Sequence, residues 1–403
     1  MLEIIDLGIM LIDRIKQIAI DIHPTVIAHR RHLHAYPELS FVEKETSAYI
    51  KKQLTGMGIS WQPMAENGVV AFIQGGKPSD RVIALRADID ALPIHELNSV
   101  DYRSTCEGVM HACGHDAHTA SLLGTASILH TLQEEFGGTV KLIFQPGEEK
   151  LPGGASLMIR DGVLENPRPD GIIGQHCDPS LAVGKVAVRP GKFMASMDGL
   201  QAWVRGKGGH GAQPHQNVDP VVIAAHIIVA LQQIVSRQAN PTQPTVLSFG
   251  KVIADGASNV IPDEVYLEGT LRTMDETWRI QAHEQIIKMA TGIAESMGGS
   301  CEFRIVKGYP YLLNNDTMSS ALRKQAETYL GADQVVEADL WMAAEDFAYY
   351  TQVTSGCFYL LGTGNVDRGI TSALHTPTFD IDESALKIST GLMAYMALKE
   401  LGN

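Results

Sequence analysis

Residues 82–90 read Val-Ile-Ala-Leu-Arg-Ala-Asp-Ile-Asp and join an apolar run, 82–85, to two carboxylates that follow it. Short apolar runs of this kind predict buried strands. Further runs occur at 140–144 and 171–174, and a helix is expected after Asp116. Strands that alternate with helices favour a largely parallel sheet covered by helices. The sequence therefore predicts an α/β fold for this part of the chain.

A different order of elements begins near residue 194. We expect strand 199–204, helix 219–238, strands 245–253 and 264–272, helix 274–297 and strand 300–306. Asp219 with Pro220 is typical of a helix start, and Thr273 with Glu276 of a capping box. This element order is the split βαβ order of a ferredoxin-like domain. We therefore predict an inserted domain, 194–306, between two parts of a discontinuous α/β domain, 1–193 and 307–403.

The composition argues against nucleic-acid-binding, membrane and secreted proteins. The 403 residues include 32 basic and 46 acidic side chains, a formal charge of -14, and such a chain repels nucleic acids and anionic membrane surfaces. The apolar stretch 2–22 is interrupted by charges and predicts an amphipathic helix rather than a signal peptide. No other apolar run approaches the roughly 20 residues that span a bilayer. Five cysteines are too few for a disulfide framework, so we expect a soluble, cytoplasmic protein.

Side chains that can bind a cation follow each of the three predicted strands. Asp88 and Asp90 follow the first strand, Glu148 and Glu149 the second, and His176 the third. The carboxyl ends of parallel strands are where open α/β sheets bind ligands. We therefore expect these five side chains to meet at one edge of the sheet.

The segment 110–118, Met-His-Ala-Cys-Gly-His-Asp-Ala-His, adds a thiol and three imidazoles, and Gly114 allows Cys113 and His115 to converge. Any one such residue is more often an ordinary core or surface group. Together, however, carboxylates and imidazoles at strand ends need a cation or a proton between them. Mixed thiolate, imidazole and carboxylate donors suit Zn²⁺, Mn²⁺, Co²⁺ or Ni²⁺ better than Mg²⁺ or Ca²⁺, and the choice among the four stays open.

Paired carboxylates give the predicted metal site a possible reaction. Pro146 and Gly147 end the second strand, which frees both Glu148 and Glu149 to point into one site. One carboxylate can bind metal while the other takes a proton from water and returns it to a leaving amine. A structural metal site needs no such base, so the pair favours hydrolysis.

These residues resemble the M20 metallopeptidases, and within that family the branch of aminoacylase-like, hippurate hydrolase-like and auxin-conjugate hydrolase-like enzymes. The resemblance covers nearly the whole chain. It rests on eight segments in order: His29-Arg-Arg-His-Leu-His-Ala-Tyr-Pro-Glu38, Leu85-Arg-Ala-Asp-Ile-Asp-Ala-Leu-Pro93, His111-Ala-Cys-Gly-His-Asp-Ala-His118, Phe144-Gln-Pro-Gly-Glu-Glu149, Gly208-Gly-His-Gly-Ala-Gln-Pro-His215, Ser258-Asn-Val-Ile-Pro262, Ala344-Glu-Asp-Phe347 and Leu374-His-Thr-Pro377.

The resemblance implies a zinc-peptidase-like catalytic domain and a ferredoxin-like lid that also forms dimers. It implies that up to two divalent metal ions per subunit are bound by five side chains: Cys113, His115, Glu149, His176 and His375. Glu148 would be the general base, and Asp90 the acidic group that tunes the catalytic centre. Asp88 stands where other branches place a metal-binding His, so the filling of the second metal site stays open. Cys177 beside His176 is also unusual, and whether its thiol approaches the metals stays open.

The same resemblance gives roles to three residues of the inserted domain. His210, in a Gly-Gly-His-Gly turn, would reach the partner's active site and stabilise the oxyanion. Asn259 and Arg272 would hold the substrate carboxylate, for which a guanidinium fork is well suited. The expected assembly is therefore a homodimer or a dimer-based oligomer.

The function expected from the sequence is metal-dependent hydrolysis of the amide bond of an N-acyl-L-amino acid to a free amino acid and a carboxylic acid. A dipeptidase, a metallo-carboxypeptidase or an N-acetyl-diaminopimelate deacetylase would use the same metals and stays open, as do the acyl group and the amino acid. A non-enzymatic metal or thiol sensor is disfavoured, because Cys113-Gly-His lacks the paired-thiol spacing of redox motifs.

Overall fold

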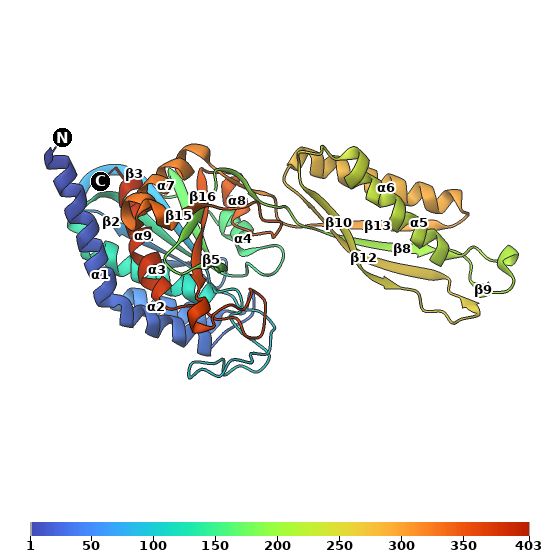
Figure 1. Ribbon diagram of the computed structural model, residues 1–403, viewed down its shortest axis with the longest axis horizontal. Coiled ribbons are helices and arrows are strands. Elements are labelled where there is room, and N and C mark those ends of the chain that lie inside the picture. The colour runs from blue at the N-terminus through green and yellow to red at the C-terminus, as the bar shows by residue number, and fades with distance from the viewer. Residues whose placement is uncertain (1, 403) are drawn as a thin grey trace. The chain divides into compact units, whose positions relative to one another are not determined.

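The computed structural model describes residues 2–402, which form two compact units (Figure 1). The first unit contains the residues up to Phe193, Leu313–Asp339 and the residues from Tyr349 onward. The second unit contains Met194–Leu312 and Leu340–Ala348. Its limits therefore differ from the predicted 194–306. The chain stays in the second unit for six further residues, and it returns there at Leu340–Ala348, a segment predicted to belong to the α/β domain, 307–403.

An eight-stranded sheet forms the centre of the first unit. Its strands lie in the order β1 (Ser60–Met64), β2 (Gly68–Gln74), β4 (Gly137–Gln145), β3 (Lys77–Asp88), β5 (Gly171–Ala182), β16 (Gly356–Gly364), β6 (Val186–Val188) and β15 (Val335–Glu337). The four central strands β4, β3, β5 and β16 are parallel. β2 pairs antiparallel with β4 and β6 pairs antiparallel with β16, while the outermost strands β1 and β15 pair antiparallel with β2 and parallel with β6. The predicted α/β fold with a largely parallel sheet is confirmed.

Helices surround this sheet and complete the core. They are α1 (Leu2–Ala35), α2 (Lys44–Gly56), α3 (His115–Thr131), α4 (Gly154–Arg160), α7 (Asp316–Leu330), the short α8 (Ala348–Thr351) and α9 (Ser384–Glu400). α1 is longer than the predicted 2–22 and contains Pro24. α1, α3 and α9 pack against one another, and α3 and α9 also contact β3.

Close packing of these three helices depends on one small residue. A Cβ atom at Gly124 of α3 would lie 2.7 Å from Val26 Cγ2 of α1 and 2.8 Å from Thr390 Cγ2 of α9. Any larger side chain would push the helices apart in a core that is packed as densely as an organic crystal. The site described below lies at the N-terminus of α3, so this packing also fixes its position.

The second unit is built on an antiparallel sheet with the strand order β10 (Thr245–Ile253), β12 (Glu264–Thr273), β8 (Asp198–Arg205) and β13 (Ser300–Lys307). Two helices, α5 (Pro220–Gln233) and α6 (Glu276–Ser296), connect the strands in the split βαβ order. Asp219 caps α5 by accepting hydrogen bonds from Val221 N and Val222 N.

The predicted cap of α6 was wrong. Asp275 caps this helix by accepting a hydrogen bond from Trp278 N, and the helix begins at Glu276. Thr273 instead ends β12, where its backbone N–H donates to Ser196 Oγ. Thr273, which the local pattern predicted as the helix cap, is therefore part of a strand instead.

One helix among the described residues, Pro220–Gln238, is long and apolar enough by length and composition to cross a membrane, with a mean hydropathy of 1.5. The expectation that no such run follows residue 22 was therefore wrong. That criterion alone is weak, because helices of protein cores meet it as well. Ile223, Ile227 and Leu231 of this helix are buried in the core of the second unit.

A buried ion cluster links the first strand of the second unit to α6. Arg279 and Asp198 are both completely buried, and Nε and Nη2 of Arg279 donate to the two Asp198 oxygens at 2.8 and 2.5 Å. His283 Nε2 lies 2.6 Å from Asp198 Oδ2. Burial alone would raise the pKa of Asp198, but the bonds from Arg279 and His283 outweigh it and lower that pKa to about 2.

Replacement of Asp198 by Asn tests this cluster. Since the folded pKa lies below the unfolded one, ionised Asp198 stabilises the fold above about pH 4 and ceases to do so as the pH falls toward 2. We expect Asp198→Asn to lower the free energy of unfolding by about 3 kcal/mol at pH 7, because the buried charge of Arg279 loses its completely buried partner and keeps only Glu276 as an ionic partner among the described residues. The difference from the wild type should shrink by about 2 kcal/mol between pH 4 and pH 2. Urea denaturation measures both values, and a difference independent of pH would contradict the assigned pKa.

Candidate metal centre

Two of the predicted ligands lie at the N-terminus of α3. Gly114, with a φ of 85°, separates Cys113 from His115, and both side chains are buried. A Cβ atom at Gly114 would lie 3.0 Å from Cys177 Cβ and 3.1 Å from Cys177 Sγ. Only glycine combines this backbone conformation with this close approach. The turn thus brings a thiol and an imidazole to the same point.

The other ligands come from three separate segments. Glu149 follows β4 after the turn at Pro146 and Gly147, as predicted. His176 lies inside β5, opposite Leu360 of β16, and not beyond the end of its strand as predicted, because β5 continues to Ala182. His375 lies in the loop before α9, and its backbone N–H donates to Ala112 O at 2.8 Å.

Two sets of donor atoms share the sulfur of Cys113. Cys113 Sγ lies 3.3 Å from Nε2 of His176 and 3.3 Å from Nε2 of His375. Cys113, His115 and His176 form one set, and Cys113, Glu149 and His375 form the other, with the atoms of each set within 4.8 Å of one another. The five predicted ligands are thus together in the structure. One thiolate between two sets is an arrangement suited to two metal ions.

The chemistry of these atoms fits a cation. His115 Nε2 and Glu149 Oε1 are buried and have no hydrogen-bond partner among the described residues, although His375 Nε2 is 3.1 Å from the carboxylate oxygen. Buried polar atoms without a partner are rare and call for a ligand. Burial, followed by the Glu149 and Glu148 carboxylates, raises the pKa of the Cys113 thiol well above its ordinary value. A nearby cation would reverse that effect and favour the thiolate.

Asp90 orients His115 and does not belong to either donor set. Nδ1 of His115 lies 2.9 Å from the backbone oxygen of Asp90 and 3.1 Å from its Oδ1, so Nδ1 carries the proton and Nε2 faces the donors. Asp90 Oδ2 accepts hydrogen bonds from Glu149 N and Ser40 Oγ. Asp90 thereby holds two ligand-bearing segments, which gives a physical form to the tuning role that the resemblance implied.

Asp88 and His118 also lie near His115, but their polar atoms are already engaged. His118 Nδ1 donates to Asp88 Oδ1 at 2.7 Å, and His118 Nε2 accepts from Cys177 N at 2.8 Å. Arg86 Nη1 donates to Asp88 Oδ2 at 2.7 Å. Sequence reasoning gave His118 no role, although its place three residues after His115 on one helix face was a usable signal.

The thiol of Cys177 packs in an apolar cluster with Met110, Ala117, Phe379 and Ile381. Its side chain is completely buried, and burial raises the pKa of this thiol well above its ordinary value. Cys177 therefore behaves as a small apolar residue beneath the Gly114 turn. Its polar contacts come from the backbone, whose N–H donates to His118 Nε2 and whose oxygen lies 2.7 Å from His176 Nδ1.

The remaining predicted residues lie in the second unit. His210 belongs to the short strand β9 (Gly209–His210), which pairs with β11 (Val260–Ile261), and it is exposed. Its Nδ1 accepts a hydrogen bond from Ala212 N, so Nε2 carries the ring proton of the neutral side chain. Asn259 is in the same ribbon, where its backbone oxygen accepts from Gly211 N. Arg272 lies on β12, and its Nη1 donates to Met342 O at 3.3 Å.

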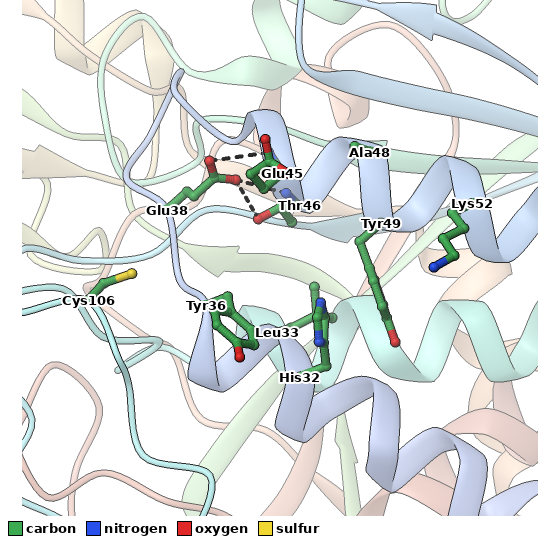
Figure 2. Close-up of a pocket in the computed structure, with 10 residues that line it drawn as sticks. All are labelled: His32, Leu33, Tyr36, Glu38, Glu45, Thr46, Ala48, Tyr49, Lys52 and Cys106. Carbon is green, nitrogen blue, oxygen red and sulfur yellow. Dashed lines mark hydrogen bonds between the residues drawn. The ribbon is translucent and has the colours of Figure 1, made fainter.

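A surface pocket of about 490 Å³ lies elsewhere in the first unit, beside α1 and α2 (Figure 2). The His32 ring stacks on the Tyr49 ring in this pocket, with 4.0 Å between the ring centroids. None of its ten lining residues is a predicted site residue: His32, Leu33, Tyr36, Glu38, Glu45, Thr46, Ala48, Tyr49, Lys52 and Cys106.

Residues 84–399 match the model of peptidase family M20/M25/M40. The chain belongs to this family. Over 378 residues it is 42% identical to the N-acetyl-L-cysteine deacetylase of Bacillus subtilis strain 168, which covers 93% of this chain and 88% of the relative. Over 305 residues it is 43% identical to the N-acyl-L-amino acid amidohydrolase of Geobacillus stearothermophilus, which covers 75% of this chain and 82% of the relative.

The structure is also similar to a crystal structure of the Bacillus subtilis YXEP protein, described as a dinuclear metal binding peptidase from the M20 family. The two share 37% sequence identity and a TM-score of 0.82, over 95% of this chain and 99% of that one. The resemblance drawn from the sequence motifs is confirmed, and family membership identifies the chain as a hydrolase of amide bonds.

Replacement of Cys113 tests the shared sulfur. Because both donor sets include Cys113, we expect Cys113→Ser to weaken binding of both metal ions, whereas His176→Ala and His375→Ala should each weaken one. Elemental analysis after dialysis against a weak chelator gives the metal content of each variant. A Cys113→Ser protein that keeps two ions per chain would show that the sulfur is not shared.

Proposed function

We propose that this protein is a metal-dependent amidohydrolase that cleaves the amide bond of N-acyl-L-amino acids and releases a free amino acid and a carboxylic acid. The observation that carries the proposal is the position of Glu148. Its carboxylate lies within 4.8 Å of donor atoms of His115 and Glu149, yet it belongs to neither set that shares Cys113. The names of the deacetylase and amidohydrolase relatives support the same substrate class.

Up to two divalent ions would be held by Cys113, His115, Glu149, His176 and His375, with Zn²⁺, Mn²⁺, Co²⁺ and Ni²⁺ as the candidates. Such ions lower the pKa of bound water and polarise the acyl carbonyl. Glu148, 6% exposed, would take the proton from the attacking water and deliver it to the nitrogen of the departing amine. Asp90 would keep His115 and the backbone of Glu149 in place throughout.

Residues of the second unit would hold the rest of the substrate. Arg272 is half-buried, and burial lowers the pKa of its guanidinium. The ordinary pKa of arginine is so high that the group nevertheless stays charged. We propose that Arg272 and Asn259 hold the free carboxylate of the amino acid. His210 from a partner subunit would donate a hydrogen bond from its Nε2–H group to the developing oxyanion.

Exposed apolar side chains support the proposed dimer. Val229 of α5 is 73% exposed, and Val252 and Ile253 of β10 are 55% and 46% exposed. β10 is also an edge strand, whose outer backbone groups are available for pairing. Exposed apolar side chains together with an open strand edge favour a second copy of the chain as the partner. We also propose a cytoplasmic location, because all five cysteines are free thiols.

Replacement of Glu148 tests the proposed function. Glu148→Gln removes the base and leaves the five metal donors, so we expect full metal content and a kcat about 10² to 10⁴ times lower on N-acyl amino acids. Glu149→Gln is the matched control, since it should lose metal as well as activity. A Glu148→Gln enzyme that keeps both its metal and its turnover would disprove the role of this carboxylate.

Mixed dimers test the proposed role of His210. We expect Glu148→Gln and His210→Ala homodimers to be nearly inactive, but a mixed dimer would contain one intact site if His210 acts across the interface. Random pairing of equal amounts should then restore about a quarter of the wild-type activity. Two affinity tags confirm subunit exchange, and exchanged dimers without activity would rule out the trans arrangement.

A further inference from the structure

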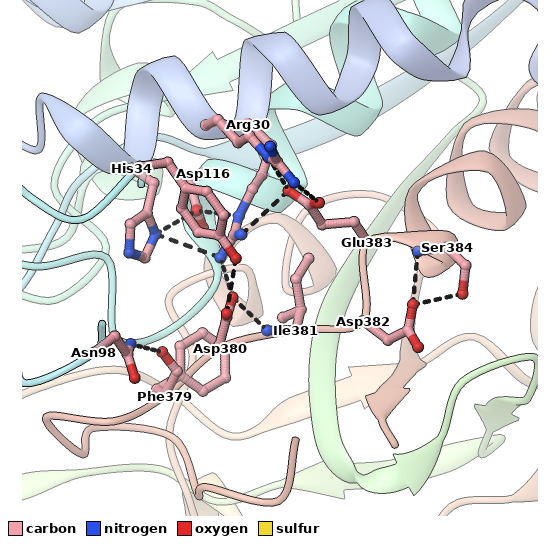
Figure 3. A network of polar contacts seen from close by, with 12 residues as sticks. Arg30, His34, Asn98, Asp116, Phe379, Asp380, Ile381, Asp382, Glu383 and Ser384 are labelled. Atoms are coloured by element: carbon pink, nitrogen blue, oxygen red, sulfur yellow. Dashed lines mark hydrogen bonds and ion pairs between the residues drawn. The ribbon is translucent and has the colours of Figure 1, made fainter. Parts of the chain in front are cut away.

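Arg30 is a completely buried cation on α1 that binds carboxylates from two other segments (Figure 3). Its Nε donates to Asp116 Oδ2 at 2.8 Å, its Nη2 donates to Asp380 Oδ1 at 2.7 Å, and Glu383 Oε1 lies 3.5 Å from Nη1. The guanidinium also packs over the ring of Tyr102, 4.8 Å from its centroid. The hydroxyl of Tyr102 donates to the second oxygen of Asp380 at 2.8 Å.

His34 extends this cluster one helical turn along α1. Its Nδ1 lies 2.8 Å from Asp116 Oδ2, the oxygen that Arg30 also binds, and its Nε2 lies 3.2 Å from Glu96 Oε1. Both ring nitrogens face carboxylates. Only the protonated ring, the imidazolium, can donate a hydrogen bond from each of its two nitrogens. Asp116 is thus fixed by two residues of α1 at once.

Asp116 and Asp380 lie in the two segments that carry three of the proposed ligands, Cys113, His115 and His375. Asp116 directly follows His115 in the first turn of α3, and Asp380 lies in the loop between His375 and α9. The backbone bond from His375 N to Ala112 O joins the same two segments on the site itself. Arg30 therefore links the segment of Cys113 and His115 to the segment of His375 through Asp116 and Asp380.

The loop of His375 needs such support. His375 has a φ of 59°, in the left-handed region that a residue with a side chain rarely adopts and that costs about 1–3 kcal/mol. Its side chain is half exposed, so packing alone holds it weakly. A strained backbone conformation persists only where the surrounding structure fixes it, and Asp380, five residues later, is anchored on Arg30.

The energetics of buried charges point in the same direction. Taking a guanidinium and several carboxylates out of water costs about as much as their mutual attraction returns, so a buried ion cluster is a poor source of stability compared with apolar packing. Such a cluster instead fixes the orientation of the groups that it joins, since each of its hydrogen bonds has a preferred angle and length. Outer groups of this kind orient the ligands of metal sites.

We infer that Arg30 and His34 are positioning residues of the metal centre, acting through Asp116 on Cys113 and His115 and through Asp380 on His375. The inference rests on the proposed metal-dependent function. It concerns residues that lie in the first of the eight motif segments and for which the sequence predicted no role.

The test compares two buried arginines in the full-length protein. Arg30→Lys keeps the charge but cannot bridge Asp116 and Asp380 with one planar fork. Arg279→Lys is the matched control, because Arg279 is equally buried and binds carboxylates, but lies in the second unit. Competition between the protein and a chromophoric chelator for Zn²⁺ gives the metal dissociation constant, and thermal unfolding of the metal-free protein gives stability.

We expect Arg30→Lys to raise the dissociation constant for Zn²⁺ by about 10- to 100-fold, while Arg279→Lys leaves it unchanged at a similar loss of melting temperature. Wild-type affinity in Arg30→Lys would overturn the inference. If Arg30→Lys does not fold, Tyr102→Phe replaces it, since it removes the hydroxyl that binds Asp380 and keeps the ring that packs on Arg30. A several-fold weaker affinity then supports the inference, and an unchanged one overturns it.

The same measurements separate this inference from the proposed function. A wild-type protein that binds no Zn²⁺ would contradict the metal centre itself. A wild-type protein that binds two ions, together with an Arg30→Lys variant that binds them equally well, would leave the proposed function standing and remove only the positioning role.

Discussion

The sulfur of Cys113 lies 3.3 Å from one nitrogen of His176 and 3.3 Å from one nitrogen of His375, in a buried place where carboxylates also converge. Metal-binding groups buried this closely together have lost their hydration, and their negative charges repel one another. A cation bound between them would compensate for both effects. On the proposed assignment, this constraint explains much of the surrounding structure. Gly114 allows the approach, Asp90 fixes the tautomer of His115, and the parallel strands deliver ligands to one edge of the sheet.

Residues next to strand or helix ends were predictable from the sequence, because local pattern determines where such residues lie. Cys113, His115 and Glu149 are of this kind, and the strand and helix order of both units follows from the same patterns. His375 could be placed only through the family motif, since no periodicity marks its loop. The position of His176 within β5 was missed because the strand continues through polar residues as far as Ala182.

Contacts between distant parts of the chain account for what the sequence could not predict. Arg30 binds Asp116 and Asp380, which are 86 and 350 residues away, and no local pattern links them. The cap of α6 moved to Asp275 because Thr273 is held in a strand by a bond to Ser196. Leu340–Ala348 joined the second unit although it follows α7 of the first. In each case contacts between distant segments decided what local sequence patterns could not.

Both units use a completely buried arginine where separate segments meet. Arg279 joins β8 to α6 in the second unit, and Arg30 joins α1 to α3 and to the loop before α9 in the first. The two clusters share their chemistry but differ in what they hold, since only the segments around Arg30 carry proposed ligands. This difference makes the second arginine a natural reference for the first.

Anomalous diffraction from crystals loaded with Zn²⁺ tests the central claim most directly. The account predicts two peaks per chain, both within about 2.3 Å of Cys113 Sγ, one beside His115 and His176 and the other beside Glu149 and His375. A single ion bound by Asp88 and His118, or two ions of which only one contacts the sulfur, would contradict it.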